Sequence, residues 1–117
     1  VDSPCNGLTF CQGCFSEMGA DIPEAIRRFA DKINFVHFRD VRGQVPKFEE
    51  TFHDNGETDM LAAMRAYREI GFEGVMRPDH APFLAGAGDT GEPTGYEMRG
   101  KIFAVGYMRG LIEASSA

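Results

Sequence analysis

The chain has 117 residues, of which 43% are hydrophobic, and this is enough apolar material for one ordinary domain with a modest core rather than a disordered chain. Its formal net charge is −6 and it has no cluster of basic residues, so it lacks the positive surface that binding to nucleic acid or to an anionic membrane requires. No apolar stretch approaches the roughly 20 residues that span a bilayer, and residues 1–4 do not begin a signal peptide, so we expect a cytoplasmic protein whose partner is a small molecule.

The cysteine content favours reduced thiols. Three cysteines, an odd number in a chain without a secretory signal, argue against a framework of disulfides. The chain also begins with Val1 and not with methionine, and we expect it to be a fragment of a longer protein.

Short apolar runs alternate with helical segments along the chain, which favours β/α units over a helical bundle. Residues 7–11 predict a short strand, and residues 12–20 predict a glycine-punctuated loop. A helix is expected to begin at Asp21, because aspartate caps helices well and Pro23 is tolerated in a first turn. Its buried face is predicted from apolar residues at helical spacing, namely Ile22, Ala25, Ile26, Phe29, Ala30 and Ile33.

The middle of the chain predicts a second β/α unit. Residues 34–39 are β-branched and aromatic around His37, as is typical of a strand. The polar stretch 40–57 that follows is longer than a usual connection between a strand and a helix, and long loops in compact domains are commonly functional. A second helix is expected from Thr58 until Gly71 ends it.

The last part of the chain predicts a third unit. Residues 74–80 form a short strand that Pro78 cuts off, and the glycine-rich segment 85–95 resembles a mobile loop or lid. The last helix is expected from about Tyr96 to Glu113.

Three such units cannot close an eight-stranded barrel, which needs about 250 residues. They predict either an open sheet or part of a larger barrel. In parallel α/β folds the chemistry lies beyond the carboxyl ends of the strands, and Cys11, His37 and Asp79 all fall at or near such ends. Thiolate, imidazole and carboxylate together can hold a divalent transition metal. Taken singly, each has a simpler interpretation, as a small buried cysteine, a core histidine and a turn-forming aspartate.

Cys11 and Cys14 form a CxxC pattern, which also occurs in thioredoxin-like redox sites and in zinc ribbons. A redox site would place its first cysteine at a helix amino terminus, whereas we expect the next helix to begin only at Asp21. A structural zinc site would need a second close pair of Cys or His residues, and Cys5 alone does not supply it.

Several polar residues near the predicted strand ends are candidates for acid–base chemistry and for substrate binding. Histidine exchanges protons near neutral pH and a tyrosine near a cation can act as a base, which makes His80 and Tyr96 candidates, although either could equally be a surface or packing residue. His53 and Asn55 could donate hydrogen bonds to a sugar hydroxyl or form an ordinary Asn-Gly turn. Arg39 and Arg77 could bind a carboxylate through two parallel hydrogen bonds or form salt bridges across the sheet.

Four blocks of the sequence resemble successive motifs of the mannonate dehydratase family: residues 6–13, 35–39, 52–60 and 76–80. The order of the blocks is as informative as their content, and the most specific parts are His37-Phe38-Arg39 and Arg77-Pro78-Asp79-His80. The chain departs from many relatives at Thr94-Gly95-Tyr96, where they have Pro-Gly-Tyr, and at Cys14, where they carry a small residue such as serine.

The resemblance implies an α/β fold in which this chain forms the C-terminal three β/α units, residues 1–117, of a single xylose isomerase-like (β/α)₈ TIM barrel whose upstream part is absent. It implies the metal-dependent dehydration of D-mannonate to 2-keto-3-deoxy-D-gluconate, in hexuronate (glucuronate) catabolism, by a full-length enzyme that we expect to be a homo-oligomer. The expected metal is manganese, or else iron or another divalent transition metal. We expect the isolated segment to be inactive.

The resemblance also assigns roles to residues. Cys11, His37 and Asp79 are implied as metal ligands, with a further histidine ligand upstream of Val1, and His80 and Tyr96 are implied as the acid–base pair. We assign His80 as the acid that protonates the leaving hydroxide and Tyr96 as the base, and the reverse assignment stays open. Two other functions stay open as well: a metal-dependent sugar isomerase or epimerase on the same barrel, and a non-catalytic thiol or zinc-binding module.

Overall fold

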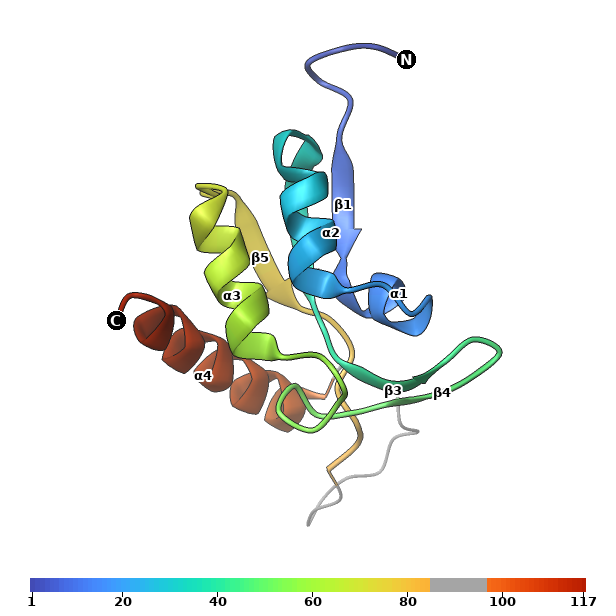
Figure 1. Ribbon diagram of the computed structural model, residues 1–117. Coiled ribbons are helices and arrows are strands. Elements are labelled where there is room, and N and C mark those ends of the chain that lie inside the picture. The colour runs from blue at the N-terminus through green and yellow to red at the C-terminus, as the bar shows by residue number, and fades with distance from the viewer. Residues whose placement is uncertain (85–96) are drawn as a thin grey trace.

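The computed structural model of the chain describes residues 1–84 and 97–117 (Figure 1). Its elements follow in chain order as β1 (Leu8–Cys11), α1 (Gln12–Glu17), α2 (Ile22–Arg28), a 3₁₀ turn (Ala30–Lys32), β2 (Ile33–Phe38), β3 (Val41–Gln44), β4 (Lys47–Glu50), α3 (Met60–Glu69), β5 (Val75–Pro78) and α4 (Met98–Ser115). No helix in the described residues is long and apolar enough to cross a membrane.

Strands β1, β2 and β5 form a parallel sheet in the order β1-β2-β5, which confirms the predicted α/β class. Helices α2 and α3 lie side by side over one face of this sheet, and α4 packs beside α3 and against β5 (Figure 1). Strands β3 and β4 form a separate antiparallel hairpin that lies beyond the carboxyl ends of the parallel strands (Figure 1).

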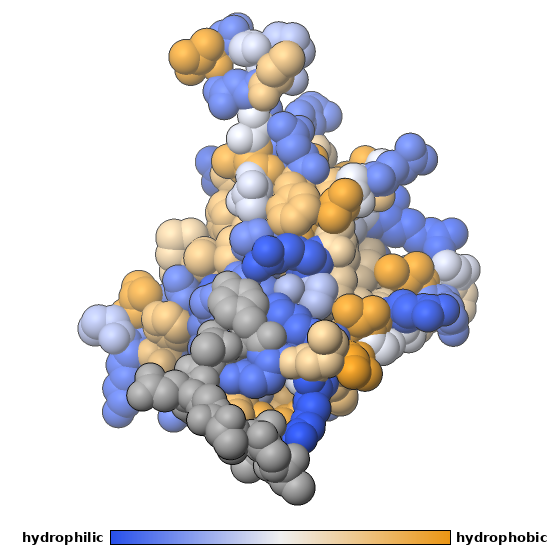
Figure 2. All heavy atoms as spheres, turned by 180° about the vertical axis from the view of Figure 1, so that it is seen from behind, coloured by the Kyte–Doolittle hydropathy of each residue, from blue (hydrophilic) through white to orange (hydrophobic). Residues whose placement is uncertain are grey.

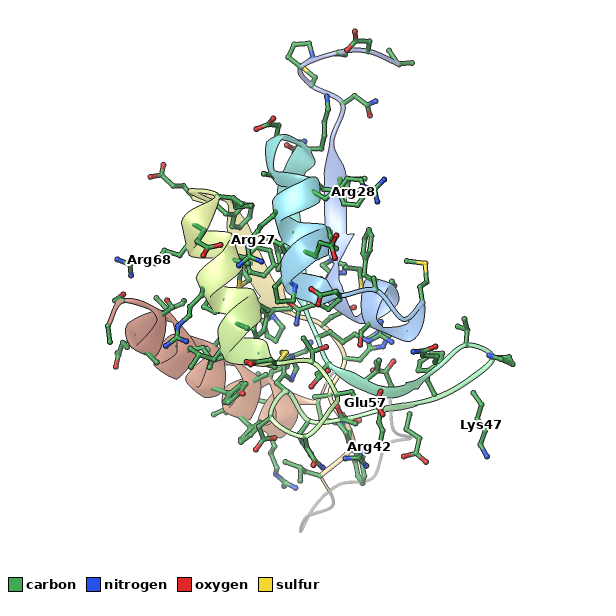
Figure 3. All side chains as sticks on the ribbon, viewed as in Figure 1. Arg27, Arg28, Arg42, Lys47, Glu57 and Arg68 are labelled. Atoms are coloured by element: carbon green, nitrogen blue, oxygen red, sulfur yellow. The ribbon has the colours of Figure 1, made fainter. Side chains whose placement is uncertain are left out.

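Alternate residues of each parallel strand face the helices and form the core. The largest buried side chains of this core come from β1, β2 and the helices, and they include Phe10, Ile26, Val36, Phe38 and Tyr67. Met76 of β5 packs against them and is partly buried. The rings of Phe10 and Tyr67 meet edge to face with their centroids 6.3 Å apart. Helices α2 and α3 are joined at their surface by an ion pair between Arg27 and Glu69 (2.7 Å), and Figure 3 shows Arg27 between the two helices.

The other face of the sheet is not covered by any helix of the described residues. It carries the strand residues that alternate with the core positions: Thr9, Cys11, Phe35, His37, Val75 and Arg77. Val75 is 63% exposed even though it lies in a strand. Figure 2 views the molecule from this side, where hydrophilic side chains gather below apolar ones.

Most of the predicted elements are confirmed with small shifts of their ends. Asp21 and Asp59 act as helix caps, and their carboxylates accept hydrogen bonds from the backbone N–H of Glu24 (2.8 Å) and Ala62 (2.9 Å). The helical pattern predicted as far as Ile33 was too long, because α2 ends at Arg28 and Ile33 already belongs to β2.

Two predictions for the connecting segments were wrong. The predicted loop at 12–20 begins with helix α1, so a helix does start directly after Cys11, and the reason given against a thioredoxin-like redox site does not hold. The polar stretch 40–57 contains the β3–β4 hairpin, which was not predicted. The predicted lid at 85–95 and the start of the last helix at Tyr96 lie outside the described residues.

Candidate metal and catalytic site

Three side chains of different chemistry meet where the parallel strands end. Cys11 is the last residue of β1, His37 pairs with it in β2, and Asp79 directly follows β5. A thiol sulfur, an imidazole nitrogen and a carboxylate oxygen from these residues all lie within 4.8 Å of one another. Sγ of Cys11 is 3.8 Å from Oδ2 of Asp79, and Nδ1 of His37 is 3.4 Å from the same oxygen. The structure therefore brings together the three residues that were predicted as metal ligands.

This cluster fits a divalent transition metal in its donor chemistry and spacing. Thiolate, imidazole and carboxylate are the protein ligands of such ions. Since metal–ligand bonds are about 2.0–2.3 Å long, two donors of one ion lie at most about 4.6 Å apart, and the two measured separations within the cluster of Cys11, His37 and Asp79 are shorter than this limit.

Asp79 is held as an anion at the end of β5. Its residue is only 6% exposed, and burial alone would raise the pKa of the carboxyl. A hydrogen bond from Nη2 of Arg77 to Oδ1 (3.0 Å) and the charges of His80, His37 and Arg77 outweigh burial, so the pKa is lowered. Lys101 on α4 donates to the backbone carbonyls of Pro78 and Asp79 and ties this strand end to the helix.

All three nitrogens of the Arg39 guanidinium donate hydrogen bonds to other residues of the protein. Its side chain is 5% exposed, Nε donates to Oε2 of Glu50 (2.9 Å), and Nη2 donates to Oε1 of Glu50 and to Oε2 of Glu17 (3.2 Å). Nη1 points at Sγ of Cys11 (3.8 Å) and of Cys14 (3.7 Å). The prediction that Arg39 binds a substrate carboxylate is not supported by this position, because its donors are already used within the protein. Arg77 is the more accessible of the two arginines, with a side chain that is 44% exposed.

Cys14 lies beside the cluster without belonging to it. Burial and a hydrogen bond with Cys11 raise the pKa of its thiol to about 11, so this thiol stays protonated near neutral pH.

His80 borders the cluster with each ring nitrogen near a carboxylate. Nδ1 lies 3.2 Å from Oε1 of Glu50, and Nε2 lies 3.9 Å from Oδ1 of Asp79. Its side chain is 39% exposed, so a substrate beside the cluster could reach it. Tyr96, the other residue of the predicted acid–base pair, lies outside the described residues.

His53 and Asn55, which were predicted to bind substrate, lie in different surroundings, because His53 is buried and Asn55 is exposed. His53 is fully buried and its Nε2 donates to the carbonyl of Phe38 (2.8 Å). Burial lowers the pKa of this imidazole despite that hydrogen bond, so the ring is neutral. Asn55 instead accepts hydrogen bonds from Arg42 through its backbone carbonyl (2.7 Å) and its side chain (3.3 Å), and Figure 3 shows Arg42 on the hairpin side of the molecule. Their binding of substrate stays a prediction.

Two residues of this site were missed in the sequence. Gln12 is fully buried directly after Cys11, where its Nε2 donates to the carbonyl of Arg39 (3.2 Å) and its Oε1 accepts from the hydroxyl of Tyr67 (3.3 Å). Glu50 joins Arg39 to His80. The signal for Gln12 was its place next to a strand-end cysteine, whereas nothing in the polar stretch 40–57 distinguishes Glu50 from its acidic neighbours.

Comparison with known proteins identifies the relatives of this chain. The family model for D-mannonate dehydratase (UxuA) matches residues 1–117. The mannonate dehydratase of Enterococcus faecalis is 41% identical over 122 aligned residues, which cover 100% of the chain and 33% of that relative. The crystal structure of mannonate dehydratase from Streptococcus suis serotype 2 superimposes with a TM-score of 0.84 at 30% identity and covers 98% of this chain and 34% of that one.

A D-tagatose 3-epimerase-like protein also superimposes, with a TM-score of 0.75 at 17% identity, covering 99% of this chain and 38% of that one. At this identity the likeness concerns the fold alone. The chain spans about a third of the length of the curated relatives that it matches.

Proposed function

Because the chain belongs to the D-mannonate dehydratase family, we propose that it forms part of an enzyme that converts D-mannonate to 2-keto-3-deoxy-D-gluconate and water. The observation that carries this proposal is the convergence of Cys11, His37 and Asp79 at the carboxyl ends of three parallel strands, with His80 beside them. Enzymes of the (β/α)₈ type hold their chemistry at this end of the strands.

We also propose that the described units are the last three β/α units of a (β/α)₈ barrel. Three observations support this: the strands are parallel, the helices of the described residues cover one face only, and the other face presents Cys11, His37 and Arg77. In a barrel that face would line the interior, and both edges of the sheet would pair with further strands. The homo-oligomeric state of the full-length enzyme, its place in glucuronate catabolism and its location in the cytoplasm stay predictions.

Cys11, His37 and Asp79 would hold a divalent cation, with manganese the expected ion. When bound, the cation would stabilise the negative charge that develops on the substrate as the proton on C2 leaves. Arg77, which is 44% exposed and adjacent to Asp79, is positioned to bind the substrate carboxylate.

Side chains of this protein are proposed to carry out the proton transfers. The dehydration breaks the C2–H bond and the C3–O bond, and the enol that results rearranges to the 2-keto acid. Hydroxide leaves C3 readily only if it is protonated as it departs. The position of Nε2 of His80, 3.9 Å from Oδ1 of Asp79, supports the proposal that His80 gives that proton. Tyr96 is proposed as the base at C2, and the reverse assignment of the two residues stays open.

The test uses the full-length enzyme with D-mannonate. Replacing Cys11, His37 or Asp79 by alanine should lower the bound manganese, measured by elemental analysis. His80→Ala should keep metal and substrate binding while kcat falls by about 10²–10⁴-fold. Full metal content after replacement of all three ligands would refute the metal site. A sugar product formed without loss of water would show that the enzyme is an isomerase and not a dehydratase.

A further inference from the structure

We propose that Glu50 is a positioning residue for His80: its carboxylate accepts a hydrogen bond from Nδ1 and so turns Nε2 toward the cluster of Cys11, His37 and Asp79. This inference rests on the proposed function, since it explains how the proposed proton carrier is held in its working orientation.

The two ring nitrogens of His80 lie in different surroundings. Nδ1 is 3.2 Å from Oε1 of Glu50, whereas Nε2 is 3.9 Å from Oδ1 of Asp79, on the cluster side of the ring. An ionised carboxylate only accepts hydrogen bonds, so the nitrogen that faces Glu50 at hydrogen-bond distance must carry a hydrogen. Nε2 is thereby left as the nitrogen that exchanges a proton with a substrate bound at the cluster.

Arg39 fixes the carboxylate that holds the ring. It binds both oxygens of Glu50 through Nε and Nη2, and its own side chain is 5% exposed and is further held by Glu17. Burial would raise the pKa of the Glu50 carboxyl, but the hydrogen bonds and charges of Arg39 and His80 outweigh it and the pKa is lowered. Glu50 is therefore an anion in one fixed geometry, which a solitary ion pair with a half-exposed histidine would not ensure.

The β3–β4 hairpin positions the carboxylate of Glu50 near His80. Val41, close after the end of β2, pairs with Glu50 in the hairpin register, so the end of β4 returns to the carboxyl ends of the parallel strands. Glu49 pairs with Arg42 and points to the other side of the ribbon, because successive residues of a strand alternate. The side chain of Glu49 makes no hydrogen bond or ion pair with any residue that the structure describes, and this makes it a matched control for Glu50.

The first experiment compares Glu50→Gln with Glu49→Gln in the full-length enzyme loaded with manganese. Glu50→Gln should lower kcat by about 10–100-fold, with KM and metal content close to the parent values, because the ring loses its orientation while the cluster keeps its ligands. Glu49→Gln should behave as the parent does. Equal kcat values for the two variants would overturn the proposal, as would a Glu50→Gln effect confined to KM.

A double-mutant cycle tests whether Glu50 acts through His80. In a His80→Ala background the change Glu50→Gln should cost almost nothing further in kcat, because the ring that it orients is gone. The same fold loss in both backgrounds would overturn the proposal. If Glu50→Gln does not fold, Glu50→Asp serves instead: it keeps a charge for Arg39 but withdraws the carboxylate from the ring, and its kcat should fall in the same manner.

A spectroscopic readout separates this inference from the proposed function. Nitrogen NMR of the His80 ring in the parent enzyme should show a hydrogen on Nδ1, and Glu50→Gln should shift the ring toward a mixture of tautomers, whatever the substrate proves to be. A neutral parent ring that carries its hydrogen on Nε2 would overturn the role of Glu50 even if D-mannonate is dehydrated. A parent enzyme that fails to dehydrate D-mannonate but shows the Nδ1 hydrogen would refute the proposed function alone.

Discussion

Replacing Tyr67 by phenylalanine removes one oxygen atom from the centre of the protein and leaves the ring in place. The hydroxyl of Tyr67, on α3, donates to Oε1 of Gln12 at 3.3 Å, and the two residues are 2% and 0% exposed. Nε2 of the same Gln12 donates to the carbonyl of Arg39 (3.2 Å) and contacts Sδ of Met60 (3.0 Å). Burial raises the pKa of Tyr67, so the hydroxyl is protonated and can donate throughout the neutral pH range.

The expected loss of stability follows from the partner that is left behind. A net hydrogen bond contributes about 1 kcal/mol, whereas a buried acceptor that loses its donor costs about 1–3 kcal/mol. In the described part of the chain Oε1 of Gln12 has no other donor, and burial excludes water from it. Because the ring is retained, no large cavity forms and the hydrophobic contribution hardly changes. Tyr67→Phe should therefore lower the free energy of unfolding by about 1–3 kcal/mol.

Urea unfolding of the full-length protein measures this loss, and Tyr107→Phe provides the control. Tyr107 is a partly exposed ring on α4 whose hydroxyl makes no hydrogen bond to the residues that the structure describes. Its replacement should change the free energy of unfolding by less than about 0.5 kcal/mol. A Tyr67→Phe protein as stable as the Tyr107→Phe protein would refute the argument that this hydrogen bond supports the segment following Cys11.

Three further changes test the loop and the helices. Gly56→Ala would place a Cβ 2.1 Å from Cγ of the buried Asp40, so it should cost about 1–3 kcal/mol in urea unfolding, and an unchanged midpoint would contradict this packing. Asp59→Ala removes the cap on the N–H of Ala62 and should cost about 1 kcal/mol, most of which Asp59→Ser should restore. Burial lowers the pKa of His53 from 6.5, so on acidification the unfolded chain binds a proton that the folded chain does not. The free energy of unfolding should therefore keep its full value above about pH 6.5 and decrease as the pH falls below it. His53→Gln should weaken this pH dependence.

The strands and capped helices could be predicted from the sequence because their signals are local. Asp21 and Asp59 lie just before amphipathic runs, and a side-chain cap depends only on residues within one turn. The apolar run around His37 marked a strand for the same reason. These patterns located three strands and the two capped helices within a few residues of their observed ends.

The segments that escaped prediction lack such local signals. Helix α1 is only six residues long, contains Gly13 and has no side-chain cap, so packing against the rest of the protein forms it. Strand β4 is exposed at every position, and it therefore shows none of the alternation between apolar and polar residues by which strands are recognised. Gly13 also packs so closely on Arg39 that an added Cβ would lie 2.7 Å from its side chain, a constraint that no sequence pattern reveals.

The two arginines at the strand ends show where sequence reasoning about a site stops. Arg39 and Arg77 each lie two residues from a strand-end candidate and were given the same role, yet their side chains are 5% and 44% exposed. A guanidinium as buried as that of Arg39 would be costly without partners, and Glu17 and Glu50 supply them from segments 22 and 11 residues away. The positive charge at position 39 is therefore satisfied by the fold itself and holds the hairpin against the strand ends. At position 77 the guanidinium is only partly engaged by Asp79 and remains accessible to a ligand, so the difference between the two roles arises from tertiary contacts and not from the strand-end pattern that they share.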